Sequence, residues 1–270
     1  DSEATNSLAP RTIYLSWAEA GEGDTRGAVV GKGTLLCLAK ADCEILDLEV
    51  IWRQSLKTSR KGHYSHRIRF SPDEKHLFVT SGDRQELEPA QDNSNNLGTI
   101  VRLNLDGTPA QGNPFADQGG VTAQIWSYGH RNLLGFDFDA EGRLWDVEHG
   151  PAGGDEFNLV EAGANYGWPT RSNGDHYNGD DIPDHTEDDG FGYLVKGLAQ
   201  GQGFEKIDLV QGILGPYAVG YLFAVEAVQI SRLAPIVNRV DHDQVVVAAL
   251  FERADLAERQ QVSNTGCSGG

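Results

Sequence analysis

Short runs of alternating apolar and polar residues dominate the first two thirds of the chain and predict β-strands. A strand is expected within residues 12–20, and two short strands around a turn are expected within 33–54. Residues 66–83 alternate as a half-buried hairpin does, with a turn at 72–74, where Pro, Asp and Glu follow one another. The N-terminal part is therefore expected to consist of hairpins.

The same pattern continues toward the middle of the chain and then weakens. Residues 98–108 predict a strand closed by an Asp-Gly turn, and 133–150 predict strand, turn and strand. Helical periodicity is absent before about residue 200. Beyond residue 195 we expect strands at 226–233 and 244–251 and, from propensity, a helix at 250–261.

One hairpin pattern recurs. The segments IRFSPDEKHLFVTSGD and FDFDAEGRLWDVEHG share an apolar residue before Phe, an acidic residue in the turn and a Leu-aromatic pair after it. Recurring hairpins separated by long loops are typical of propeller blades. A β-sandwich also has regular strands, but its connections are shorter. The fold expected is all-β.

Composition narrows the classes of function. The chain has 33 Gly in 270 residues and a net charge of −18, which suits a turn-rich fold and makes a nucleic-acid partner improbable. The most apolar stretch, 212–230, is interrupted by Gly, Pro and Glu, so no membrane span is expected. Residues 173–190 are rich in carboxylates without regular calcium-loop spacing, which leaves a solvated loop and a cation site open.

Three cysteines bear on the compartment. Cys37 and Cys43 are spaced to close a small hairpin disulfide, while Cys267 lies in a Gly- and Ser-rich tail. One close pair is compatible with an oxidising compartment. No signal peptide or Met is recognisable, and we expect a processed mature form or a fragment.

Two histidines stand before the strand of the first hairpin. His63 and His66 lie beside Arg67. In a propeller, a histidine in this position faces the central channel, where imidazole is suited to general-base catalysis. An ordinary turn role and metal binding by the pair remain open, although this spacing does not specify zinc.

Two further segments carry polar groups. Arg131 and Asn132, in the segment SYGHRN, offer a permanently charged donor fork and an adjacent amide. Isolated residues of these types also occur in ordinary turns. Gly150 and Pro151 end a predicted strand, and carbonyls at such a position are ligands that Ca²⁺ accepts.

Together these segments resemble one known family. GHYSHRIRFSPDEKHLFVTSGD, AQDNSNNLGTIVRLNLDGT, IWSYGHRN and GFDFDAEGRLWDVEHGPAGGDEFNLVEAGANYGWP are similar to segments of the soluble glucose/sorbosone dehydrogenase family. The resemblance is dense from about residue 60 to 185 and thinner from 11 to 59. It implies a single six-bladed β-propeller domain over 1–270, with the best-supported blades in 60–190. Pyrroloquinoline quinone and calcium are the implied cofactors.

The resemblance also implies roles for three residues. His63 matches the family's base, which takes the proton from the C1 hydroxyl of an aldose as hydride passes to the quinone. Arg131 and Asn132 match the pair that contacts the quinone. The charge of Arg131 is expected to stabilise the developing oxyanion, so His63 and Arg131 are the catalytic candidates.

Calcium ligands are implied in the same way. Gly150 and Pro151 match the carbonyl donors of the cofactor's calcium in some members. Glu156 and Tyr166 match a calcium pair in others, and the two sites are compatible with each other.

The sequence departs from the family pattern at several places. Members usually have another blade's sequence before residue 12, so the ring is expected to be incomplete, without its first blade. Ser65 and His66 replace small residues and are expected to alter the pocket. Beyond 190 the basic cofactor contacts are not recognisable, and Arg253 and Arg259 are the only loose candidates.

Three functions follow as hypotheses. The first is oxidation of an aldose to a lactone, with electrons passed to a soluble acceptor, by a periplasmic or secreted monomer or homodimer. The second is a non-catalytic propeller that binds sugar or protein and keeps calcium as a structural ion. The third is a calcium-dependent propeller lactonase, for which the Asn residues at 95 and 96 offer a faint signal.

Overall fold

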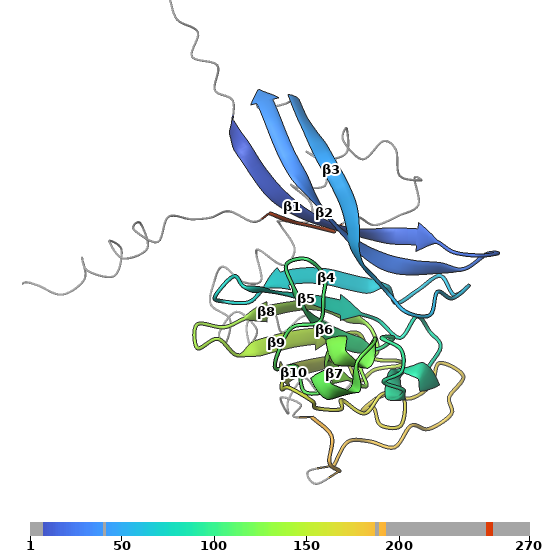
Figure 1. Ribbon diagram of the computed structural model, residues 1–270. Coiled ribbons are helices and arrows are strands. Elements are labelled where there is room, and N and C mark those ends of the chain that lie inside the picture. The colour runs from blue at the N-terminus through green and yellow to red at the C-terminus, as the bar shows by residue number, and fades with distance from the viewer. Residues whose placement is uncertain (1–7, 40–41, 187–188, 193–246, 251–270) are drawn as a thin grey trace, which may run out of the picture.

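The computed structural model describes residues 8–39, 42–186, 189–192 and 247–250. These residues form antiparallel sheets with short 3₁₀ turns and no α-helix, which confirms the all-β prediction (Figure 1). The strand expected at 226–233 and the candidates Arg253 and Arg259 lie outside the described residues, as does the helix expected at 250–261 except for Leu250, which ends strand β11. The strand expected at 244–251 is confirmed over its described part, 247–250. Within the described part, no helix has the length and apolar character needed to cross a bilayer.

The first sheet is long and projects from the rest of the molecule (Figure 1). Its strands run in the order β11-β1-β2-β3: β11 Val247–Leu250, β1 Leu8–Ala20, β2 Arg26–Ala39 and β3 Asp42–Arg53. The expected disulfide between Cys37 and Cys43 is present and joins paired positions of β2 and β3. The hairpin predicted within 33–54 is confirmed and begins earlier than expected.

The second and third sheets contain the two repeated hairpins. The second comprises β4 Ser65–Phe70, β5 His76–Ser81, β6 Thr99–Asn104 and β7 Ile125–Tyr128; the third comprises β8 Leu133–Phe138, β9 Leu144–Glu148 and β10 Glu156–Val160. Phe70 ends β4 and Phe138 ends β8, so the repeat in the sequence is a repeat in the structure. In the first turn, the Asp73 carboxylate accepts from the Ser71 hydroxyl at 2.6 Å.

The second sheet packs against the first sheet with one face and against the third sheet with the other. Leu77 and Val79 pack with Tyr14 and Trp52 of the first sheet. Phe78, between them in sequence, packs with Phe136 and other residues of the third sheet. Alternate residues of a strand point to opposite faces, so one strand joins two cores. The three sheets therefore stack face to face around the second.

One end of the second and third sheets gathers the loops that matter for function. The start of β4 pairs with the end of β5, and the start of β8 pairs with the end of β9. The Asp83 N–H donates to the Arg131 carbonyl, so the loop after β5 meets the loop before β8, and the loops before β4 and after β9 lie at the same end.

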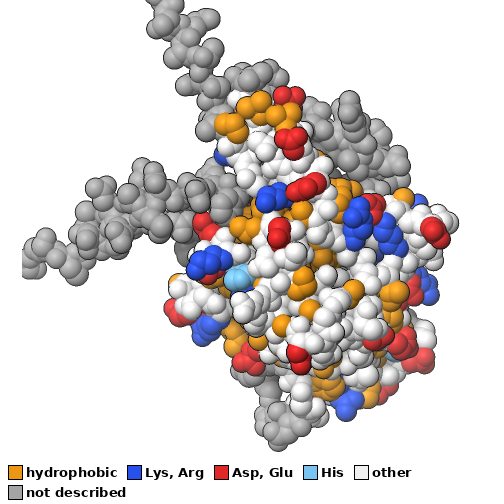
Figure 2. All heavy atoms as spheres, in the orientation of Figure 1, with side chains coloured by type: hydrophobic (Ala, Val, Ile, Leu, Met, Phe, Trp, Pro, Cys, Tyr) orange, Lys and Arg blue, Asp and Glu red, His pale blue; other side chains and the backbone are white. Residues whose placement is uncertain are grey.

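The molecular surface is mixed in charge. Acidic and basic side chains are interspersed on the face shown in Figure 2. On β3, Leu46 and Leu48 are 37% and 47% exposed.

Candidate active site

A histidine–aspartate pair occupies the loop end of the second sheet. The His63 Nδ1 atom lies 2.6 Å from Oδ1 of Asp83, whose side chain is fully buried directly after β5. The approach is close, because a Cβ on Gly82 would lie 2.1 Å from the His63 carbonyl oxygen. Only glycine fits between the two loops, so the sequence order Gly82-Asp83 positions the carboxylate against the imidazole.

Asp83 is anchored on its other side. Its Oδ1 also accepts from the Gln85 backbone N–H at 2.9 Å, and its Oδ2 accepts from the Trp168 indole N–H at 2.7 Å. With the carboxylate held on both oxygens, His63 Nδ1 is the donor and Nε2 is the basic nitrogen. Nε2 has no hydrogen-bond partner among the described residues, and 15% of the His63 side chain is exposed.

Arg131 lies beside this pair. The Asp83 backbone N–H donates to the Arg131 carbonyl at 2.8 Å. The guanidinium carbon lies 5.1 Å from the centre of the Trp168 ring and 5.8 Å from that of Tyr177. Trp168 therefore contacts both Asp83 and Arg131, which places the predicted base and the predicted cation in one cluster.

The Arg131 guanidinium has unused donor capacity. Its Nη1 donates to the His149 carbonyl at 2.6 Å, whereas Nε is buried without a hydrogen-bond partner. A buried unpaired donor on a charged group is costly unless a ligand satisfies it. Asn132 follows directly; it is half-buried, and its carbonyl accepts from the His149 backbone N–H at 3.0 Å.

The loop after β9 is tightly folded around carbonyl groups. The Gly150 N–H donates to Asp155 Oδ1 at 2.9 Å, and His149 Nδ1 donates to the Gly150 carbonyl at 2.7 Å. A Cβ on Gly150 would lie 2.3 Å from the Gly153 carbonyl oxygen and 2.4 Å from that of Gly154. Pro151 is buried in the same turn. The predicted calcium donors thus belong to a carbonyl-rich loop beside Arg131, the kind of donor set that Ca²⁺ accepts.

The second predicted calcium pair, Glu156 and Tyr166, makes hydrogen bonds outside the loop of Gly150 and Pro151. The Tyr166 hydroxyl donates to the Leu159 carbonyl at 2.6 Å and accepts from the Glu161 N–H at 2.9 Å, and burial raises its pKa above the usual range. The Glu156 carboxylate accepts from the Asn158 amide at 3.3 Å. The two side chains therefore have separate partners, and shared calcium binding by them stays a prediction.

Two other residues singled out in the sequence, His66 and Asn96, hold the structure together through their side chains. His66 is buried, and its Nδ1 bonds to the Ser16 hydroxyl at 3.0 Å, away from the His63–Asp83 contact. Burial, followed by the charges of Arg67 and Arg84, lowers the pKa of His66 to about 3. Asn96 accepts from the Ser55 N–H at 2.6 Å through its side chain.

Asp83, Trp168 and Glu148 were not singled out by the sequence analysis. Glu148 Oε2 accepts from the Arg131 backbone N–H at 2.7 Å and so fixes the loop that carries the guanidinium. In the sequence, Asp83 is marked only by its position just after an alternating strand, and an ordinary turn residue has the same position.

The chain is similar in sequence to known proteins over much of its length. A family model described as glucose/sorbosone dehydrogenase matches residues 4–197. The aldose sugar dehydrogenase YliI of Escherichia coli (strain K12) is 37% identical over 191 residues, which cover 70% of this chain and 49% of that protein. Quinoprotein glucose dehydrogenase B of Acinetobacter calcoaceticus is 34% identical over 170 residues, covering 53% of this chain and 33% of that protein.

Solved structures give the same grouping. The apo-form of the soluble aldose sugar dehydrogenase from Escherichia coli superposes with a TM-score of 0.60 at 37% identity, covering 65% of this chain and 50% of that chain. The PQQ-bound aldose sugar dehydrogenase from Streptomyces coelicolor gives a TM-score of 0.53 at 27% identity, covering 70% and 49%. The chain spans about half the length of the curated relatives it matches first. It belongs to the glucose/sorbosone dehydrogenase family.

Proposed function

We propose that the protein is a quinoprotein sugar dehydrogenase, which oxidises the C1 hydroxyl of an aldose to a lactone and passes the electrons to an external soluble acceptor. The observation that carries the proposal is the cluster of His63, Asp83 and Arg131 around Trp168. It combines a basic nitrogen with a buried cation that has an unpaired donor. Relatives named as aldose sugar and glucose dehydrogenases support the same activity.

The residues present fit the proposed cofactors. The unpaired Nε of Arg131 and the adjacent Asn132 amide suit the carbonyl and carboxylate oxygens of pyrroloquinoline quinone. The carbonyls of Gly150 and Pro151 would hold Ca²⁺ in the carbonyl-rich loop. When bound, the quinone supplies the hydride acceptor and calcium supplies Lewis acidity; the protein supplies position and charge.

Within this chain, His63 is assigned the proton transfer. Asp83 keeps the Nδ1 proton in place, so Nε2 receives the proton of the sugar's C1 hydroxyl. The aspartate also stabilises the imidazolium that forms, because its charge is buried at 2.6 Å. Arg131 places a fixed positive charge where negative charge develops, in a position preset by Glu148, His149 and Trp168.

A propeller fold and an extracytoplasmic location are part of the same proposal. The stacking of three sheets around a doubly buried second sheet is what successive propeller blades require and supports a propeller, whose six blades are implied by the family resemblance. The Cys37–Cys43 disulfide supports a periplasmic or secreted protein. For the lactonase alternative, the candidate amide of Asn96 is occupied by the Ser55 N–H.

The test is sugar-dependent turnover. The full chain, supplied with pyrroloquinoline quinone and Ca²⁺, is assayed for glucose-dependent reduction of a dye acceptor. The His63→Ala variant should lose roughly 10²–10⁴-fold in rate, the usual contribution of a general base. His76→Ala is the matched control, because His76 begins β5 at the end away from Asp83, and it should keep the wild-type rate. Equal rates for wild type and His63→Ala would refute the assignment.

A further inference from the structure

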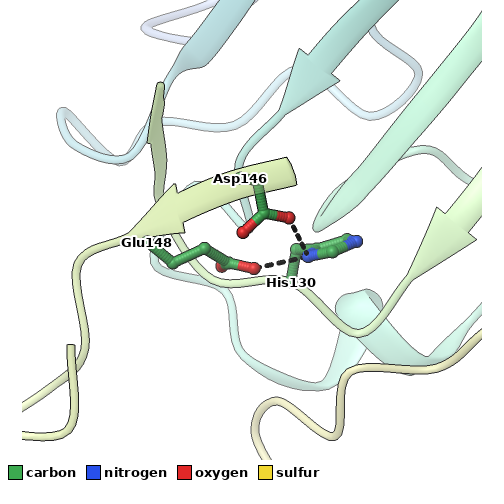
Figure 3. A group of neighbouring side chains, drawn as sticks. All are labelled: His130, Asp146 and Glu148. Atoms are coloured by element: carbon green, nitrogen blue, oxygen red, sulfur yellow. Dashed lines mark hydrogen bonds and ion pairs between the residues drawn. The ribbon is translucent and has the colours of Figure 1, made fainter. Parts of the chain in front are cut away.

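A group of mostly buried polar side chains lies next to the Arg131 backbone, and in the proposed reaction only its Glu148 has a role, through the hydrogen bond from the Arg131 N–H. Asp146 and Glu148 are alternate residues of β9, and Glu156 and Asn158 are alternate residues of β10. The register pairs Glu156 with Glu148 and Asn158 with Asp146, so all four side chains share one face. His130, from the loop before β8, joins them (Figure 3).

The ring nitrogen of His130 points at two carboxylates. Its Nδ1 contacts Glu148 Oε1 and lies 3.6 Å from Asp146 Oδ2, as the dashed lines in Figure 3 show. Its Nε2 is bonded to the Ser127 hydroxyl at 2.8 Å. One nitrogen is therefore anchored by a neutral partner, and the other faces the acidic side chains. His130, Asp146 and Glu148 are almost completely buried, at 0%, 0% and 2% exposure.

The group has too few hydrogen-bond donors. The Asn158 Nδ2 atom lies 3.1 Å from Asp146 Oδ1, 3.4 Å from Glu148 Oε1 and 3.3 Å from Glu156 Oε2. An amide nitrogen carries two hydrogens, so it cannot satisfy three carboxylates at once. Asp146 Oδ2 is buried without a hydrogen-bond partner and, as Figure 3 shows, points into the group.

Asn158 gives an independent sign of a missing ligand. Its side chain is fully buried, and its Oδ1 also has no hydrogen-bond partner. Turning the amide over would exchange Nδ2 for Oδ1 in front of the carboxylates. The same residue is thus suited to donate hydrogen bonds when no ion is bound and to offer an oxygen when a cation is bound.

Electrostatics favour a cation at the same place. Glu148 and Glu156 stand directly opposite each other across the two strands, an arrangement that destabilises a sheet when both are charged. A bound divalent ion would remove this repulsion.

We propose that His130, Asp146 and Glu148 bind one divalent first-row transition-metal ion of the Zn²⁺ or Mn²⁺ class. One ligand atom from each of the three residues lies within 4.8 Å of the others, and this is the only such trio among the described residues. Imidazole nitrogen with carboxylate oxygen suits these ions, whereas Ca²⁺ takes oxygen ligands. The site differs from the carbonyl loop at Gly150 and Pro151 because its ligands are side chains.

The ion would support the neighbouring active-site loop. Glu148 uses Oε1 toward His130 and Oε2 toward the Arg131 N–H, so one carboxylate would join the ion to the loop carrying the guanidinium. This inference goes beyond the proposed sugar oxidation and does not require it.

The test uses the full chain with metal alone and neither quinone nor sugar. After treatment with a chelator and desalting, the protein is titrated calorimetrically with Zn²⁺, Mn²⁺ and Ca²⁺ in separate experiments. We expect one Zn²⁺ or Mn²⁺ per chain, with Ca²⁺ at least tenfold weaker at this site. Co²⁺ serves as a spectroscopic probe, whose visible absorption should show nitrogen ligation that is lost in His130→Gln.

Three variants make the result specific. Asp146→Asn and Glu148→Gln should weaken Zn²⁺ binding at least tenfold, whereas Asp180→Asn, at an exposed loop carboxylate, should leave it unchanged. Circular dichroism checks that each variant is folded, and Asp146→Asn should fold because it removes a buried charge. Absence of saturable Zn²⁺ and Mn²⁺ binding to the wild type, or equal affinity in Asp146→Asn and Glu148→Gln, would overturn the proposal. A chain that binds Zn²⁺ but fails to bind quinone would refute only the proposed oxidation.

Discussion

Replacement of Asp83 by asparagine separates a catalytic arrangement from a merely structural one. Asp83 Oδ1 receives the His63 and Gln85 donors at 2.6 and 2.9 Å, and Oδ2 receives the Trp168 indole N–H at 2.7 Å. Asparagine has only one acceptor oxygen. In one orientation of the asparagine, its oxygen accepts from His63 and Gln85 and its NH₂ group faces the Trp168 indole N–H. In the other orientation, its oxygen accepts from Trp168 and its NH₂ group faces His63 and Gln85.

The cost follows from these contacts. An unsatisfied buried donor costs about 1–3 kcal/mol, and loss of the charge from the histidine hydrogen bond removes about 1 kcal/mol more. We therefore expect Asp83→Asn to lower the free energy of unfolding by about 2–4 kcal/mol. In catalysis the substitution disturbs the imidazole tautomer, and we expect kcat to fall roughly 10²–10⁴-fold with KM little changed.

The assay measures dye reduction by the cofactor-loaded chain over a range of glucose concentrations, alongside denaturant unfolding of the same preparations. Trp168→Phe is the companion variant, because it removes one donor to Asp83 and leaves the His63 contact. It leaves the buried Asp83 Oδ2 without that donor, so it should lose about 1–3 kcal/mol of stability and less than tenfold in kcat. If Asp83→Asn loses stability as expected but keeps kcat within about threefold of wild type, the positioning role of Asp83 is refuted.

Two further predictions concern other sites. Gly150→Ala places a Cβ 2.3 and 2.4 Å from backbone oxygens, so the loop must shift, and we expect at least tenfold weaker calcium-dependent quinone binding; unchanged affinity would contradict the assigned carbonyl site. The pKa of His66 falls from 6.5 to about 3 on folding, so the unfolded chain binds a proton that the folded chain excludes. The contribution of neutral His66 to the free energy of unfolding should be fully present above pH 6.5, and it should fall by up to roughly 5 kcal/mol as the pH drops toward 3. His66→Asn should flatten that part of the unfolding-versus-pH curve, and an unaltered curve would contradict the assigned cause.

Much of the hairpin structure was predictable because local rules act there. The alternation in 66–83 and 133–150, with turn residues between the runs, predicts β4–β5 and β8–β9 as they occur. The spacing of Cys37 and Cys43 likewise predicts the observed disulfide. In these segments the strand pattern, the turn chemistry and the final packing all favour the same structure.

The site was less predictable because it depends on contacts between distant segments. Asp83 and Trp168 are 85 residues apart, yet they share a hydrogen bond. His63 and His66 are only three residues apart, but His63 lies in the loop and reaches Asp83, whereas His66 lies in β4 and is buried against Ser16. Period-two spacing of Asp146 with Glu148 and of Glu156 with Asn158 did contain a usable signal. Only the register of β9 against β10 shows that the four side chains meet.

The most direct test of the central claim is an equilibrium titration of the calcium-loaded full chain with pyrroloquinoline quinone, followed by the absorbance of the quinone. We expect saturable, calcium-dependent binding in the micromolar range, weakened at least tenfold in Arg131→Ala, because that variant removes the buried guanidinium with its unpaired Nε. Absence of saturable binding at micromolar quinone with calcium present would contradict the dehydrogenase assignment.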